Sequence, residues 1–235
     1  MQQKIPALGY DIIEEVIKSN IDHILEVKKY NPYHDRLGRF TSSRGGVGGV
    51  SLGMGVGNYV AEGKRAAVSG TLQAAEAKNK DLDHEVATIV DPYTGKAVFS
   101  KDGDATGVHF NSSELWEIKG RIVTHNHPDE VIFSPSDFAV SYHVKAIRAT
   151  NPSGKVYELA EMNNRQAVQE YNKHYMEVRA KSLKRLGVAE NSRDKDLTPE
   201  QRKSSYAEIS DSCDKWLSDN ASKYRYQYRT GRIEE

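Results

Sequence analysis

The feature that most restricts the fold of this chain is the alternation of short β-branched segments with helix signals between residues 82 and 160. A Pro/Gly turn, "PYTG", separates the first two segments and predicts a β-hairpin. In chain order, the predicted elements are a strand in "HEVATIVD", a strand in "KAVFS", one or two helical turns in "ELWEIKG", a strand in "RIVTHNH", a helix in "SPSDFAVSYHVKAI", and a strand pair in "IRATN" and "VYELA". Strands and helices that alternate in so short a stretch predict a compact mixed α/β core.

Three further segments surround this core. Residues 1–30 contain one predicted amphipathic helix, with apolar side chains at helical spacing over residues 10–29. Residues 31–81 begin with a turn and continue into a predicted flexible linker from Gly38 to Gly63, followed by a helix or a partly ordered lead-in over residues 64–80. Residues 161–235 are highly charged and predicted to be helical. The predicted fold class is therefore α/β (α+β): a mixed sheet at residues 82–160 with flanking helices and helical N- and C-terminal extensions.

The balance of charge disfavours nucleic acid as a partner. The chain has 33 basic and 33 acidic side chains, so no global field attracts a polyanion. Near the C-terminus, Tyr224, Tyr226 and Tyr228 are interleaved with Arg225 and Arg229, a pattern that could stack on bases. The favoured interpretation is that these tyrosines are exposed or packed on a helical assembly surface.

Membrane insertion and cysteine chemistry are also disfavoured. No run of eighteen apolar residues occurs, and the N-terminal residues lack the pattern of a signal peptide, so we expect a cytoplasmic protein. Cys213, the single cysteine, cannot form an internal disulfide and has no histidine pattern around it. We expect no nucleophilic role for it.

Two histidines at the end of the third predicted strand form a candidate metal site. His125 and His127 are two residues apart, so on a strand their imidazoles point to the same face. A catalytic zinc usually takes three protein ligands. Asp137, in the first turn of the helix that begins at Ser134, is the candidate third ligand. The string "SPSD" is also a helix N-cap box in its own right, with Pro135 at the first helical position.

A hydrolytic zinc site also needs a carboxylate that accepts a proton from water. Glu85, at the start of the first strand, is the favoured candidate. The residue next to it, His84, is an alternative, as are Glu114 and Glu117 just before the histidine motif.

This arrangement resembles the JAMM (MPN-domain) zinc metallopeptidase family. The shared features are a Glu on an early strand, then His-x-His-Pro at the end of a later strand, then Ser-x-x-Asp at a helix start. The familiar form has six residues between the Pro and the Ser, whereas this chain has the five residues "DEVIF", which bears on the shape of the loop. The resemblance covers residues 82–160. It implies an MPN-like core in which His125, His127 and Asp137 hold Zn²⁺, Glu85 is the general acid/base, and Ser134 helps to stabilise the oxyanion.

A second resemblance concerns the context of the protein. The segment "NPYHDRLGRF" looks like a tag of phage head and structural proteins, and the form "HNHP" with "FSPSD" is similar to a phage and prophage branch of the JAMM family. These features predict a phage or prophage zinc hydrolase that acts on a peptide or isopeptide bond in a protein or peptide substrate. It would be found in the host cytoplasm or associated with the virion, with phage structural proteins as further partners. Two alternatives remain open: a minor head or assembly protein that keeps the fold without turnover, and a zinc-dependent toxin or effector.

Overall fold

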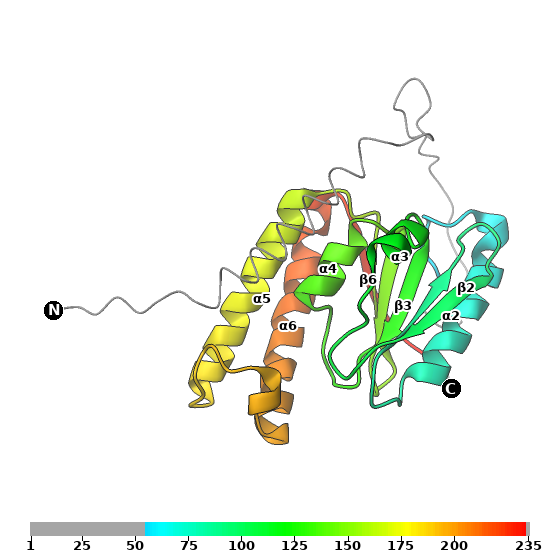
Figure 1. The fold of residues 1–235 in the computed structure, drawn as a ribbon. Coiled ribbons are helices and arrows are strands. Elements are labelled where there is room, and N and C mark those ends of the chain that lie inside the picture. Colours follow the sequence, from blue (N-terminus) through cyan, green and yellow to red (C-terminus); the bar gives the residue numbers. More distant parts are fainter. Residues whose placement is uncertain (1–54, 234–235) are drawn as a thin grey trace. The chain divides into compact units, whose positions relative to one another are not determined.

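The computed structural model describes residues 55–233 and has the predicted mixed α/β architecture (Figure 1). Six strands form one sheet, and helices flank it. The elements are η1 (Glu62–Lys64), α2 (Arg65–Asn79), β1 (Val86–Val90), β2 (Ala97–Asp102), α3 (Ser112–Glu117), β3 (Ile122–Asn126), α4 (Pro135–Ser141), β4 (Ala146–Thr150), β5 (Lys155–Ala160), α5 (Arg165–Arg185), η2 (Asp194–Asp196), α6 (Pro199–Tyr224) and β6 (Gln227–Arg232). The predicted helix of residues 10–29 and the segment "NPYHDRLGRF" lie outside the described residues.

The strand order in the sheet is β2-β1-β3-β4-β5-β6. The predicted hairpin of β1 and β2 and the predicted pair of β4 and β5 are confirmed, both antiparallel. Only β3 and β4 are parallel to each other. Two parallel strands cannot be joined by a tight turn, so the chain crosses over between them, and this crossover contains α4.

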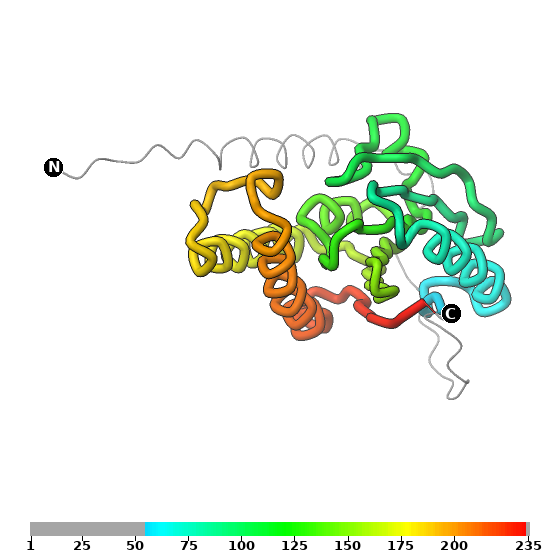
Figure 2. The backbone as a smooth tube through the Cα atoms, turned by 90° about the horizontal axis from the view of Figure 1, so that it is seen from below, coloured from blue at the N-terminus to red at the C-terminus, as the bar shows by residue number. Residues whose placement is uncertain are grey.

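The two faces of the sheet carry different helices. Figures 1 and 2 show α2 on one face, and α4, α5 and α6 together on the other. The inner strands β1, β3 and β4 are buried along their whole length, because helices cover both of their faces. β1 is therefore a nearly continuous apolar run in the sequence, whereas β3 and β4 also carry buried polar side chains, among them Thr124, His125 and Arg148.

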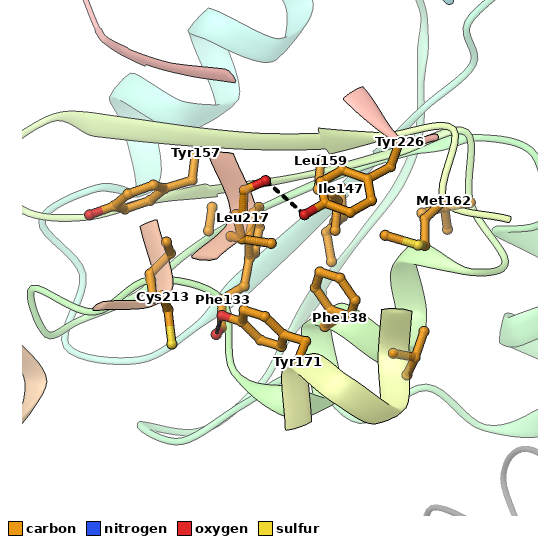
Figure 3. Close-up of a cluster of buried hydrophobic side chains, with 14 of the residues drawn as sticks. Phe133, Phe138, Ile147, Tyr157, Leu159, Met162, Tyr171, Cys213, Leu217 and Tyr226 are labelled. Carbon is orange, nitrogen blue, oxygen red and sulfur yellow. Dashed lines mark hydrogen bonds between the residues drawn. The ribbon is translucent and has the colours of Figure 1, made fainter. Parts of the chain in front are cut away.

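The main hydrophobic core lies between the sheet and helices α4, α5 and α6 (Figure 3). Phe138 of α4 stacks on Tyr171 of α5 with ring centroids 4.2 Å apart. The Tyr171 hydroxyl donates to the carbonyl of Phe133 (2.7 Å), and the Tyr226 hydroxyl donates to that of Leu217 (2.7 Å), so both buried phenols are satisfied. Tight aromatic packing thus joins the C-terminal helices to the predicted core.

A buried ion network lies on the opposite face, under α2. Arg148 of β4 is 1% exposed and donates to Glu76 of α2 (Nε to Oε1, 2.6 Å) and to Glu158 of β5. The Thr124 hydroxyl also donates to Glu76 (2.9 Å), and the Tyr59 hydroxyl donates to Glu158 (2.8 Å). Opposite charges and hydrogen bonds compensate each other there, as buried charges require.

One end of the predicted linker differs from the prediction. Within residues 55–63, which belong to the glycine-rich segment, Val56, Tyr59 and Val60 are buried on the α2 face, whereas residues 61–63 are exposed. The apolar side chains among the glycines cover the edge of the second core. The rest of the predicted linker lies outside the described residues.

The predicted helix of residues 134–147 is too long. The structure ends α4 at Ser141, and Ala146 and Ile147 belong to β4. Parallel pairing with β3, in which Ile122 pairs with Ala146, takes these residues into the sheet. Tertiary pairing overrides their local helical pattern.

The C-terminal residues also differ from the helical prediction. Arg225 adopts a left-handed conformation (φ 60°) that ends α6, and the chain then forms β6 along the edge of the sheet. Tyr224 and Tyr226 are buried, and the Tyr228 hydroxyl donates to Asp214 (2.8 Å). Tyr224 and Tyr226 therefore pack inside this protein, so the interpretation as part of an assembly surface is wrong for these two residues.

Candidate metal centre

The candidate site lies at the carboxyl end of β3, where the chain leaves the sheet and crosses to α4. In open α/β sheets, ligands bind beyond the carboxyl ends of the strands, near such crossovers. His125 is in β3, His127 follows its last residue, and Asp137 is in the first turn of α4. The local fold therefore brings both ends of the loop of residues 128–134 to one point.

The two imidazoles converge as the i, i+2 spacing predicts. The Nε2 atoms of His125 and His127 lie 2.9 Å apart, and the two residues are 5% and 3% exposed. The other ring nitrogen of His127, Nδ1, lies 3.0 Å from the carbonyl oxygen of Val131. Because a carbonyl only accepts, Nδ1 carries the hydrogen, and in the neutral ring Nε2 is left with a lone pair that faces the site.

Asp137 is both a cap residue and part of the cluster. Its backbone N–H donates to the Ser134 hydroxyl (3.2 Å), and its Oδ2 accepts from the Ser134 N–H (2.7 Å), which completes the predicted capping box. The same carboxylate faces both histidines: Oδ1 is 3.3 Å from Nε2 of His125, and Oδ2 is 3.3 Å from Nε2 of His127. The cap thus aims the carboxylate at the imidazoles.

The donor set fits a zinc ion. Ligands about 2.0 Å from a tetrahedral zinc are separated by about 3.3 Å, close to the distances between Asp137 and the two Nε2 atoms. Two lone-pair nitrogens and a carboxylate this close repel one another unless a proton or a cation lies between them. A zinc ion held by these three residues would keep its fourth position for water, as zinc does in catalytic sites.

Glu85 stands beside this cluster. The antiparallel register of β1 and β3 pairs Ala87 with His125, so Glu85, two residues earlier, comes opposite His127. Its Oε1 lies 3.9 Å from Nε2 of His127, and the residue is 7% exposed. Glu85, His125 and His127 form a group in which one ligand atom of each lies within 4.8 Å of the others. Glu85 is therefore close enough to act on a group bound at the site, and it is also a possible ligand.

The side chain of Asn126 holds the backbone on both sides of Glu85. Its Oδ1 accepts from the N–H of Val86 (2.7 Å), and its Nδ2 donates to the carbonyl of His84 (2.8 Å). Asn126 is 1% exposed and points to the opposite side of β3 from the histidines. The middle residue of His-Asn-His thus fixes the position of the carboxylate that the histidines face.

Burial and charge change the acidity of the metal-free site. Burial raises the pKa of Glu85, although the neighbouring His127 and His125 oppose the rise. Burial alone would lower the pKa of His127, but its contact with Asp137 and the charge of Glu85 outweigh burial and raise it to about 9. Burial disfavours ionised Asp137, yet the charges of His125 and His127 hold its pKa well below the usual range. In the metal-free site, the fold therefore favours a protonated His127 beside an ionised Asp137.

No family model, curated protein or solved structure that was compared matches this chain.

The other candidate bases are not at the site. The Glu114 carboxylate caps α3 and pairs with Lys101. Glu117 is exposed, and the side chain of His84 contacts Asp83 at the surface. The structure therefore leaves Glu85 as the carboxylate that faces the histidine pair from β1.

Three structural facts complete the comparison with the sequence. The Ser134 hydroxyl serves the helix cap, and its predicted role toward an oxyanion stays a prediction. The contacts of Asn126 and the contact from His127 to Val131 were not predicted, although the entirely polar string "THNH" at a strand end was a usable signal for Asn126. Among residues 55–233, no helix has the length and apolar character needed to cross a membrane.

Proposed function

We propose that this protein is a zinc-dependent hydrolase that cleaves a peptide or isopeptide bond, with His125, His127 and Asp137 as zinc ligands. The observation that carries the proposal is the approach of Asp137 to within 3.3 Å of both Nε2 atoms, from a different element of the fold. The same residues carry the resemblance to the JAMM family. In this proposal the substrate is a protein or peptide in a phage or prophage context.

A bound zinc ion supplies Lewis-acid activation of water and of the substrate carbonyl. Glu85 accepts the proton that water loses as its oxygen bonds to the carbonyl carbon. When the C–N bond breaks, Glu85 returns this proton to the departing amine nitrogen. A raised pKa suits both steps, since it makes the carboxylate a better proton acceptor near neutral pH. The hydroxyl of Ser134 accepts in the helix cap, which leaves its hydrogen to donate to the oxyanion.

Distance and the helix cap support Asp137, rather than Glu85, as the proposed third ligand. Asp137 lies nearer to Nε2 of His127 than Glu85 does (3.3 Å against 3.9 Å), and it also reaches His125. Its orientation is fixed by the capping box. Glu85 is the more distant group and is held through its backbone, as suits a residue that exchanges protons.

The test replaces Glu85 by glutamine and measures zinc content and hydrolysis together, on linear and isopeptide-linked peptide substrates. Glu85→Gln keeps the size of the side chain but cannot accept a proton. We expect it to retain zinc and to lose roughly 10²- to 10⁴-fold in rate. The matched control is Glu114→Gln, which changes a carboxylate of the α3 cap and is expected to leave the rate unchanged. Loss of zinc from Glu85→Gln would instead make Glu85 a ligand and remove the general base from the proposal.

A second candidate function is a phage head or assembly protein that uses the metal for stability alone. The burial of the imidazoles, 5% and 3% exposed, favours it, because a covered site gives a substrate little access. In that case zinc is present, no substrate is hydrolysed, and Glu85→Gln changes nothing but stability.

A further inference from the structure

Helix α6 holds the loop that connects the histidines to α4. Ser210 of α6 is 7% exposed, and its hydroxyl makes two hydrogen bonds to this loop. It accepts from the N–H of Ile132 (3.1 Å) and donates to the carbonyl of Glu130 (3.2 Å). One side chain from a helix about eighty positions away therefore fixes the loop on both sides of Val131.

The carbonyl between these two contacts orients a proposed zinc ligand. The Val131 oxygen lies 3.0 Å from Nδ1 of His127. A partner at Nδ1 fixes the rotation of the ring and keeps the Nε2 lone pair toward the site. A continuous path thus runs from the Ser210 hydroxyl through the backbone of Val131 to the imidazole of His127.

Other contacts hold this loop at different atoms. The N–H of Ser153 donates to the side-chain carboxylate of Glu130 (2.8 Å), not to its backbone. The Tyr171 hydroxyl holds the carbonyl of Phe133, beyond the segment that Ser210 brackets. Arg202 and Asp129 form an ion pair at 3.5 Å whose side chains are 37% and 40% exposed. Exposed pairs of this kind contribute little. Ser210 is the described residue of α6 whose contacts flank Val131.

We propose that Ser210 is a positioning residue for the metal site, acting on His127 through the carbonyl of Val131. The inference rests on the proposed zinc function and assigns the C-terminal helical region a part in it. Contacts outside the ligand shell typically change metal affinity by about 10- to 100-fold. Because Ser210 acts through one additional hydrogen bond, an effect of about 10-fold is expected.

The experiment compares wild type, Ser210→Ala, Ser210→Thr and Ser205→Ala. Thr keeps the hydroxyl, and Ser205 is a second buried serine of α6 that serves as the matched control. Zinc affinity is measured by chelator competition. Amide hydrogen exchange of Ile132 is measured in the zinc-free proteins, because that amide donates directly to Ser210.

We expect Ser210→Ala to weaken zinc binding about 10-fold and to speed exchange at Ile132 by about fivefold or more. Ser210→Thr should remain closer to wild type than Ser210→Ala in both measurements, and Ser205→Ala should match wild type. Equal zinc affinity of wild type and Ser210→Ala, or unchanged exchange at Ile132, would overturn the inference. A wild type that binds no zinc, with Ile132 responding to Ser210→Ala as expected, would overturn the proposed function instead.

Discussion

Replacing Arg148 by methionine removes the cation that two buried carboxylates share. After the change, Glu158 keeps two other hydrogen-bonding partners, whereas Glu76 keeps the Thr124 hydroxyl, 2.9 Å away, and loses both of its contacts to the guanidinium. Removal of one partner from a buried ion pair costs about 3–5 kcal/mol, a large part of the roughly 5–15 kcal/mol that stabilises a typical domain. For a domain of this size the melting temperature should fall by roughly 10 °C.

Urea denaturation followed by circular dichroism measures this loss. Adding Glu76→Gln to Arg148→Met should recover part of the free energy of unfolding, because the stranded carboxylate is then neutral. The matched control is Arg193→Met, which removes an arginine that is 70% exposed and pairs with Asp196 at 3.2 Å. We expect no measurable shift of the midpoint in this control. A loss in Arg148→Met no larger than in Arg193→Met would refute the reasoning.

Three further changes have defined outcomes. Asn126→Ala should lower the free energy of unfolding by about 1–3 kcal/mol, because the backbone around Glu85 loses two buried hydrogen bonds. The variant should keep its zinc but hydrolyse the substrate more slowly, and an unchanged rate of hydrolysis would contradict this. In EDTA, the free energy of unfolding should fall by about 3 kcal/mol between pH values of about 6.5 and about 9. The folded state raises the pKa of His127 to about 9, so the stability that its protonated form provides is lost as the pH rises through that value. A urea midpoint that does not change over this range would exclude the effect. Gly95→Ala should lower the melting temperature more than Gly154→Ala. Both glycines have a φ near +74°, but a Cβ at Gly95 would come within 2.8 Å of α2. Equal decreases in melting temperature would show that only φ matters.

Local signals made much of the fold predictable. Some features depend only on neighbours in the chain, and the structure has them: the turn ending in Gly95, the short apolar runs in β1 and β3, and the cap at Ser134. The same locality explains why the convergence of His125 and His127 could be expected from their spacing on one strand. The approach of Asp137 followed from a short loop and a helix cap.

Contacts between distant segments could not be read in this way. β6 is polar, and its place in the sheet depends on pairing with β5 and on the network around Glu158. Tyr59 lies in a glycine-rich stretch, and its buried hydroxyl donates to Glu158, 99 positions away. Ser210 resembles any other serine of a charged helix until the loop beside it is known. These residues gain their roles from tertiary packing, which no local pattern encodes.

The most direct test of the central claim is the zinc content of the purified protein after dialysis against metal-free buffer. Wild type should retain close to one zinc per chain, and His127→Ala should retain none. His84→Ala, which removes an exposed imidazole from the neighbouring strand start, should behave as wild type. Absence of zinc from the wild type, or equal zinc in wild type and His127→Ala, would contradict the account.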